Sequence, residues 1–351
     1  MRKLPALKDF KHIAIIQTAF LGDVALALPL AQAIKNLHPD VQLSFITTPS
    51  AASLVACCTA VDNVITYDKH GLQSGLRGIR FIGKDLSERK VDCVLALHRS
   101  FRTTFLTYLA EPNYSVAFDI NVLALLFKKR ISYKRYIHEV ERNLSLLKGF
   151  SNFDESIINA QTVNLEIDAD DKEYIDSKLQ WLGLKNEDKI ILIAPGSIWN
   201  TKRWLPEYYT ILAGMLINKG YKIILSGSKD DKILCDEIAN KSNSFNMAGE
   251  TSIPQTLYLM QKANLVVTND SSPTHFANLV NCPVVTIFGP TSPIFGFGAR
   301  GERDKVVEID NLKCRPCKIH GSKKCPINTH ECMVKISPEM VFKACEVIIK
   351  E

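Results

Sequence analysis

Residues 263–291 read ANLVVTNDSSPTHFANLVNCPVVTIFGPT, and this stretch decides the fold. Leu265–Thr268 is a short apolar, β-branched run that predicts a buried strand. A polar turn follows, and Pro273 suits the first position of a helix that has Ser272 as its N-cap. A second apolar run, Cys282–Phe288, ends in a glycine turn. The stretch therefore predicts a strand, a helix and a second, parallel strand.

The start of this helix is a candidate anion site. Free backbone N–H groups and the helix dipole favour negative charge where a helix begins at the carboxyl end of a parallel strand. Proteins of the α/β class hold nucleotide phosphates at that edge. A well-capped helix in an ordinary strand–helix–strand unit explains the same pattern, so other turns must separate the two interpretations. The candidate ligand-binding residues in this stretch are Asp270, Ser271, Ser272, Thr274, His275 and Gly289.

The same alternation of strand and helix patterns runs through the chain of 351 residues. It is typical of parallel sheets that helices cover on both faces. A polar, weakly periodic stretch at 152–162 suits a linker. We therefore expect an α/β protein of two Rossmann-like domains, 1–160 and 161–351, whose sheets face a central cleft. The final helix, 338–350, is a candidate to pack back on the first domain.

The N-terminal sequence raises the question of export. MRKLPALKDFKHIAIIQTAFLGD places basic residues before an apolar run, as a signal peptide does. The apolar run is short, contains Gln17 and continues directly into Gly22 and Asp23, so we interpret it as the first strand. No run approaches the roughly 20 apolar residues of a membrane span. We expect a cytoplasmic protein, with peripheral attachment to the inner membrane as an open alternative.

The positive charge lies entirely in the first half of the chain. Residues 1–165 hold 20 Lys and Arg against 14 Asp and Glu, whereas the remainder holds 23 of each, which accounts for the net charge of +6. A solvated basic surface is the simple explanation, and an anionic partner on the first domain is the functional one. No RNA-binding motif or recognition helix is present, so we expect no nucleic acid partner. Arg99 and Arg102 closely follow a predicted strand at 91–97 and are the candidate residues for binding such an anionic partner.

The turn after the first strand carries a candidate general base. Gly22 permits close backbone approach, and Asp23 lies at the start of the next predicted helix. An N-cap is the ordinary role for such an aspartate. A positioned carboxylate can instead draw the proton from a sugar hydroxyl and accelerate its attack roughly 10²–10⁴-fold.

A lysine loop, residues 194–204 (APGSIWNTKRW), follows a predicted strand in the second domain. It lacks the glycine and lysine spacing of a P-loop. It nevertheless brings Ser197, Thr201 and Lys202 to the carboxyl end of a strand, where an ammonium group could neutralise a departing diphosphate. A surface loop on which Trp199 and Trp204 pack is the structural alternative.

Together these motifs resemble glycosyltransferase family 9, the bacterial heptosyltransferases of lipopolysaccharide core synthesis, and the nearest subgroup is heptosyltransferase II. The resemblance extends from about residue 11 to the C-terminus, and it is stronger in the second half than between 70 and 160. The matching motifs are Phe20–Asp23, Ala194–Ser197, Lys202–Trp204 with Pro206, Asn269–His275 and Phe288–Thr291.

The resemblance implies a GT-B fold and an inverting transfer that requires no metal or other cofactor. The implied donor is ADP-L-glycero-β-D-manno-heptose (ADP-heptose), and the implied acceptor is a heptose of the phosphorylated inner core, built on lipid A–Kdo at the cytoplasmic membrane face. Asp23 matches the catalytic base of the family, and Ser197 and Lys202 match its diphosphate contacts. Asp270 and His275 match its donor-site residues. Because like charges repel, we do not expect Asp270 to contact phosphate. We expect it to bind heptose hydroxyls or to orient a neighbouring hydrogen-bond donor.

A separate group of cysteines lies near the C-terminus, within nineteen residues. A cytoplasmic location makes disulfides unfavourable. The spacing is compatible with a structural zinc site, and free thiols are the equal alternative. The four residues are Cys314, Cys317, Cys325 and Cys332.

Three other functions compete with heptosyl transfer to the inner core. A transferase of the same family could use a different donor or acceptor. A nucleotide-sugar epimerase could share the architecture, although no clear His/Glu pair for that chemistry is present. A bilobal binding protein without catalysis is the third. Asp23 and Lys202 facing one another across the cleft would favour transfer.

Overall fold

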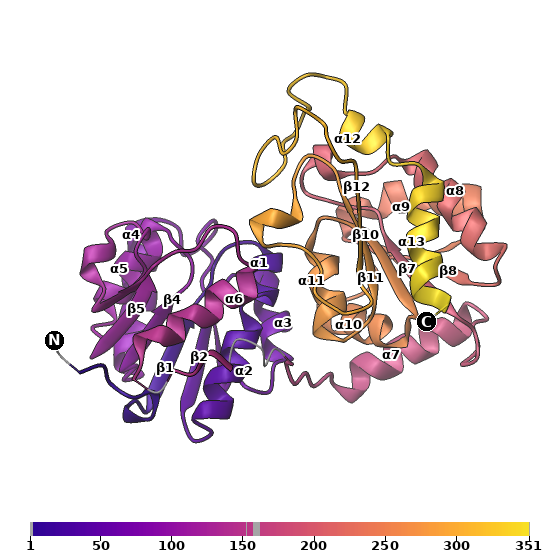
Figure 1. Ribbon diagram of the computed structural model, residues 1–351. Helices are drawn as coiled ribbons and strands as arrows, with labels where there is room; N and C mark the ends of the chain where they lie inside the picture. The colour runs from indigo at the N-terminus through magenta and orange to yellow at the C-terminus, as the bar shows by residue number, and fades with distance from the viewer. Residues whose placement is uncertain (1–2, 152, 157–161, 351) are drawn as a thin grey trace. The chain divides into compact units, whose positions relative to one another are not determined.

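The computed structural model describes residues 3–151, 153–156 and 162–350. The chain divides into two compact units, Met1–Glu166 and Ile167–Glu351. The expected domain boundary, between 160 and 161, lies outside the described residues. Each unit is an α/β layer structure around one six-stranded sheet (Figure 1).

The sheet of the first unit is entirely parallel, in the order β3-β2-β1-β4-β5-β6. His12 pairs with Gln42 and Ile13 pairs with Cys93, so β1 is central. β1 is buried along its whole length, which explains its unbroken apolar pattern. The strands are β1 (His12–Ile16), β2 (Gln42–Thr47), β3 (Asn63–Thr66), β4 (Cys93–Ala96), β5 (Tyr114–Phe118) and β6 (Lys129–Ile131). The helices are α1 (Leu21–Ala25), α2 (Leu28–Leu37), α3 (Ala52–Ala56), α4 (Gly75–Glu88), α5 (Phe101–Leu109) and α6 (Glu139–Leu144).

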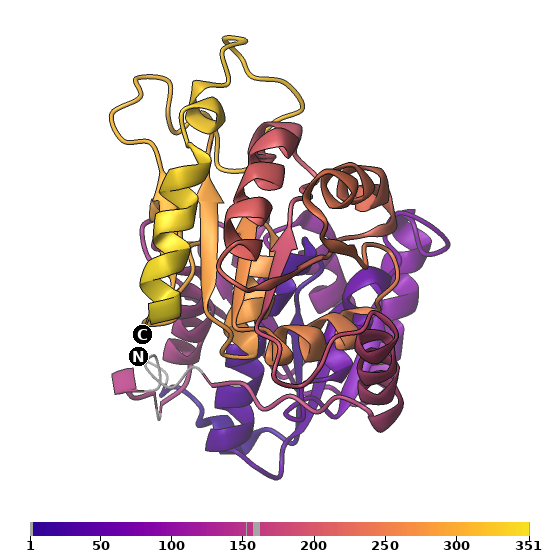
Figure 2. The same cartoon turned by 90° about the vertical axis from the view of Figure 1, so that its right-hand side faces the viewer.

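The second unit repeats this plan, in the order β12-β11-β10-β7-β8-β9. Helices α8, α9 and α13 cover one face of its sheet, and α10 and α11 lie on the other (Figures 1 and 2). The strands are β7 (Ile190–Ala194), β8 (Lys222–Leu225), β9 (Phe245–Asn246), β10 (Leu265–Asn269), β11 (Val284–Phe288) and β12 (Lys305–Glu308). The helices are α7 (Ala169–Trp181), α8 (Pro206–Ile217), α9 (Lys232–Ser242), α10 (Ile253–Lys262), α11 (Ser272–Leu279), α12 (Glu331–Val334) and α13 (Pro338–Lys350).

The final helix, α13, contributes to the core of its own unit. Val341, Cys345 and Ile348 are buried there beside residues of α8 and β11. Its proposed packing on the first domain stays a prediction. Among the described residues, no helix is both long enough and apolar enough to cross a bilayer.

Two helix boundaries differ from the sequence prediction. The N-cap of α11 is Ser271, so the predicted N-cap, Ser272, is wrong by one residue. Pro273 tolerates the shift because every N–H of the first turn lacks an intrahelical partner. The helix predicted to start at Asp23 begins at Leu21 and is divided into α1 and α2, because Pro29 at the start of α2 has no N–H with which to continue α1.

Candidate active site

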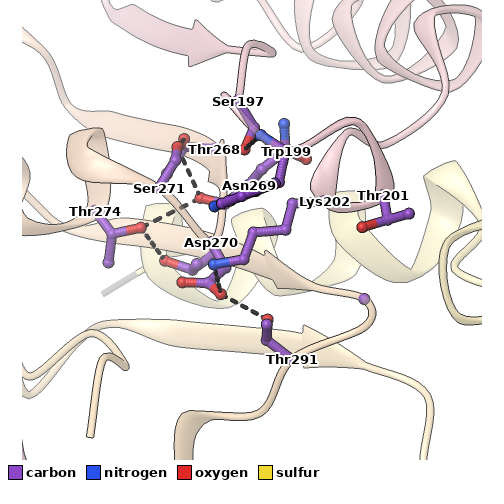
Figure 3. A network of polar contacts seen from close by, with 12 residues as sticks. Ser197, Trp199, Thr201, Lys202, Thr268, Asn269, Asp270, Ser271, Thr274 and Thr291 are labelled. Atoms are coloured by element: carbon purple, nitrogen blue, oxygen red, sulfur yellow. Dashed lines mark hydrogen bonds and ion pairs between the residues drawn. The ribbon is translucent and has the colours of Figure 1, made fainter. Parts of the chain in front are cut away.

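Three loops meet at the carboxyl edge of the second sheet. Nζ of Lys202, from the lysine loop, lies 2.6 Å from Oδ2 of Asp270, which follows β10. The hydroxyl of Thr291, in the turn after β11, donates to the same oxygen at 2.6 Å (Figure 3). The side chains of Lys202 and Asp270 are only 12% and 6% exposed. The edge therefore holds a charge-balanced, largely buried pair that an anionic ligand could reorganise.

Asn269 holds the lysine loop against the end of β10. Its side-chain nitrogen donates to the carbonyl of Pro195 at 2.8 Å. Its side-chain oxygen accepts from the backbone N–H of Trp204 and the hydroxyl of Tyr209, both at 3.0 Å. The sequence analysis placed Asn269 only within a turn, because these partners come from other segments. The structure makes it the residue that positions both ends of the lysine loop.

The N-terminus of α11 faces the same edge. The side chain of its N-cap, Ser271, accepts no hydrogen bond from the helix and instead lies 3.3 Å from the hydroxyl of Thr268. Thr274 is fully buried, and its hydroxyl bonds internally to Thr286 and to the carbonyl of Asn269. Thr274 thus secures the turn, whereas Ser271 and Ser272 are half-buried at the helix start.

His275 is a neutral imidazole in this position. Burial and, as a smaller effect, the positive charge of Lys202 together lower its pKa to about 3. Its Nδ1 atom is buried without a hydrogen-bond partner in the described part of the chain. A neutral ring within electrostatic reach of Lys202 can donate one hydrogen bond without adding charge.

Thr201 and Gly289 have structural partners. The hydroxyl of Thr201 donates to the carbonyl of Ser322 at 2.9 Å and accepts from its N–H at 2.8 Å. A Cβ on Gly289 would lie 2.8 Å from the sulfur of Met333, so glycine allows that packing. Ser197 is half-buried and accepts from the N–H of Trp199 at 3.3 Å. Of these residues, Ser197 is the one whose hydroxyl is least committed to the fold.

In the first unit, Asp23 lies in the first turn of α1. The N-cap of α1 is Phe20, so the capping role considered for Asp23 is wrong. Asp23 is half-buried and within electrostatic reach of Lys69. Burial and the charge of Arg102 lower the pKa of Lys69, and the negative charge of Asp23 partly opposes them.

The turns after β1, β3 and β4 form a cationic group around Asp23. Nζ of Lys69 donates to the carbonyl of Thr18 at 2.5 Å, and the hydroxyl of Thr18 lies 2.8 Å from Nδ1 of His98. Burial lowers the pKa of His98 to about 4, assisted by the charges of Lys69, Arg99 and Arg102. Lys69 and His98 were missed from the sequence. For His98 the available signal was its position directly after the predicted strand at 91–97, because residues at strand ends gather at one sheet edge.

The four cysteines lie within electrostatic reach of one another. Burial raises the pKa of Cys332 to about 11, and the other three thiols act in the same direction. Burial acts to raise the pKa of Cys325, yet hydrogen bonds from the backbone of residues 327–330 leave it below its usual value. In the described ranges, no group of three or more His, Cys, Asp or Glu side chains is placed to hold a metal ion. Structural zinc therefore stays a prediction, which metal analysis of the purified chain would test.

Comparison with known proteins identifies the chain. The model of glycosyltransferase family 9 (heptosyltransferase) matches residues 79–327. The chain belongs to glycosyltransferase family 9. The predicted family is thus confirmed, and this family member is a glycosyltransferase enzyme.

Relatives and solved structures agree with this assignment. The lipooligosaccharide heptosyltransferase 2 of Campylobacter jejuni (serotype O:2) is 25% identical, with 98% of this chain and 99% of the relative covered. The lipopolysaccharide heptosyltransferase 2 of Escherichia coli K12 is 26% identical, with 81% and 84% covered. A family 9 glycosyltransferase from Veillonella parvula superposes with a TM-score of 0.87 at 21% identity, covering 97% and 98% of the two chains. The E. coli ADP-heptose lps heptosyltransferase II superposes with a TM-score of 0.76 at 22% identity, covering 97% and 99%. The predicted GT-B fold is confirmed.

Proposed function

We propose that this family 9 enzyme transfers a heptose from ADP-L-glycero-β-D-manno-heptose to the inner core of lipopolysaccharide. Relatives named lipooligosaccharide or lipopolysaccharide heptosyltransferase 2 match most of the chain, which supports this proposal. The observation that carries the proposal is the Lys202–Asp270 pair at the start of α11. A buried ammonium group, a helix N-terminus and a neutral imidazole together suit a diphosphate leaving group.

In the proposed reaction, Asp23 removes the proton from the acceptor hydroxyl as that oxygen attacks the anomeric carbon. The bond between this carbon and the diphosphate breaks in the same step, so the configuration inverts and ADP leaves. The carboxylate of Asp23 ends the step protonated. We propose that Lys202 neutralises the ADP oxygens, a role that a metal ion performs in other transferases. Asp23 and Lys202 belong to different units, and their meeting over one pocket stays a prediction.

Asp270 suits the second of its two predicted roles, the orientation of a neighbouring hydrogen-bond donor. Its carboxylate already accepts from Lys202 and Thr291, so it holds the ammonium group at the edge where the diphosphate would arrive. On phosphate binding, Lys202 can turn between the two anions without leaving the edge. Asp270 then acts through Lys202 and does not itself contact phosphate.

The acceptor we propose is the phosphorylated inner core on lipid A–Kdo at the cytoplasmic membrane face. Support comes from the cationic group around Asp23, since Lys69, Arg99 and Arg102 suit phosphate or carboxylate groups of such an acceptor. The excess of positive charge in the first half of the chain acts in the same direction.

Incubation of the purified protein with ADP-heptose and truncated core acceptors tests the proposal. Mass spectrometry should show one added heptose on one acceptor, together with released ADP. A parallel reaction with ADP-glucose distinguishes heptose from another ADP-sugar as donor, and Asp23→Ala is the inactive control. Failure with every acceptor, or release of ADP without any glycosylated product, would contradict the proposal.

A further inference from the structure

The loop between β5 and β6 exposes a run of large apolar side chains. We define residues 119–127 as the apolar loop. Leu125 is 83% exposed, and Ile120, Val122, Leu123 and Leu126 are each 44–50% exposed. Single exposed apolar residues are ordinary, whereas five within seven positions form a contiguous patch of the kind that contacts another molecule.

The protein holds this loop in a defined shape. The hydroxyl of Thr104, on α5, donates to the carbonyl of Val122 at 2.6 Å. Residues 124–126 form a 3-10 turn, and Leu123 before it adopts a left-handed conformation with φ of 53°. A non-glycine residue in that conformation is unfavourable and persists only where its surroundings require it. The exposed apolar side chains are therefore a built feature of the loop.

Basic residues follow the apolar loop directly. Residues 119–137 contain five Lys or Arg and a single acid, Asp119, and that acid accepts a hydrogen bond from the N–H of Tyr133 at 3.0 Å. We define residues 128–135 as the basic segment. The buried guanidinium of Arg142 donates to the carbonyls of Lys134, Arg135 and Ile137, which fixes the end of this segment. Lys128, Arg130, Lys134 and Arg135 are exposed.

We propose that the apolar loop inserts into the surface of an anionic lipid bilayer while the basic segment binds the lipid phosphates. Apolar side chains beside Lys and Arg on one surface are the pattern of proteins that bind in the interfacial plane. A second copy of the chain is a poorer occupant, because two copies would bring their basic segments together and the like charges would repel.

The position of the apolar loop connects membrane binding with catalysis, and this connection rests on the proposed function. Because the strands are parallel, the apolar loop after β5 lies at the same sheet edge as the turns after β1 and β4, which carry Asp23, Arg99 and Arg102. The guanidinium of Arg99 lies 4.5 Å from the ring centre of Tyr133, in the basic segment. Insertion would thus hold the acceptor-facing edge at the surface where a lipid-anchored acceptor is embedded.

Vesicle sedimentation with the full chain tests the proposal. The probes are vesicles of phosphatidylcholine alone and vesicles that also contain phosphatidylglycerol. We expect binding to the anionic vesicles, weakened by high salt because charge attraction is screened. Leu125→Asp should lower the partition coefficient at least about tenfold, since an inserted leucine becomes a charge. Exchange of Lys134 and Arg135 for Glu should lower it roughly fivefold per residue or more.

The matched control is Ile233→Asp, on α9 of the second unit, because Ile233 is 84% exposed and Leu125 is 83% exposed. This variant should bind vesicles like the unmodified chain. Equal binding by Leu125→Asp and the unmodified chain would overturn the proposal, and so would a lipid-free dimer that dissociates only in Leu125→Asp.

A transferase assay separates this inference from the proposed function. With a vesicle-embedded acceptor Leu125→Asp should lose activity, and with a delipidated, water-soluble acceptor it should retain activity. Equal loss on both acceptors would contradict membrane delivery. If the unmodified chain transfers no heptose at all, the proposed function fails, while sedimentation still decides whether the loop binds lipid.

Discussion

The Lys202–Asp270 pair makes a quantitative prediction about the second unit. Asp270→Asn keeps the shape of the side chain but leaves the ammonium group of Lys202 largely buried without a counterion. Loss of one partner from a buried ion pair destabilises a protein by roughly 3–5 kcal/mol, and we expect about 3 kcal/mol because Lys202 is 12% exposed. The free energy of unfolding of the second unit should fall by that amount.

Tryptophan fluorescence during urea unfolding measures this change in the intact chain. The three tryptophans, Trp181, Trp199 and Trp204, all lie in the second unit, so the signal reports on that unit. The matched control is Glu237→Gln, which breaks an exposed ion pair on α9, where Nζ of Lys241 lies 2.8 Å from Oε1 of Glu237. Exposed pairs contribute less than about 1 kcal/mol, so the control should unfold close to the unmodified chain.

Addition of ADP connects the measurement to function. A diphosphate bound to Lys202 supplies the missing negative charge, so ADP should restore much of the stability lost in Asp270→Asn. Lys202→Met should gain little stability from ADP, because the cation that binds it is absent. Unchanged unfolding of Asp270→Asn, or equal stabilisation of Lys202→Met and the unmodified chain by ADP, would refute the reasoning.

Three further predictions concern other residues. Asp23→Ala should lower turnover roughly 10²–10⁴-fold while calorimetry shows nearly unchanged binding of ADP-heptose, and preserved turnover with lost donor affinity would exclude Asp23 as the base. Arg99→Glu and Arg102→Glu should each raise the acceptor KM more than the donor KM in steady-state kinetics. A larger effect on the donor KM would contradict the assignment of these residues to acceptor binding. His275 has a folded pKa near 3 against 6.5 unfolded, so the unfolded state binds the extra proton, and its contribution to stability is present above pH 6.5 and is lost as the pH falls toward 3. His275→Gln should therefore flatten the decline in unfolding midpoint, followed by tryptophan fluorescence, below pH 6.5, and an unaltered pH profile would show that His275 does not titrate this way.

The central strands were predictable because their signal is local. Residues 190–194 and 284–288 are apolar, β-branched and buried on both faces, so their pattern alone indicates parallel strands. The short strands β6 and β9 carry no such pattern. Residues 75–88 form α4, since Ile79, Ile82 and Leu86 bury one face of the helix.

The site residues likewise divide into those that local sequence predicts and those that it does not. Polar residues at strand ends identified Asp23, Lys202 and Asp270 as candidates, because the carboxyl edge of a parallel sheet gathers such residues. Lys69 and His98 were missed, since each has meaning only beside Thr18, and Asn269 was missed as the clamp of the lysine loop. Hydrogen bonds between distant segments leave no trace in local spacing.

The amino-acid sequence by itself determined the alternation of strands and helices, the family and the strand ends at which the polar residues lie, because each of these depends on neighbours along the chain. Only the tertiary structure decided that Asp270 pairs with both Lys202 and Thr291, and that Arg142 holds the end of the basic segment. The physical reason is that strand order and register bring distant segments together, and the partner of a buried charge is chosen by that arrangement.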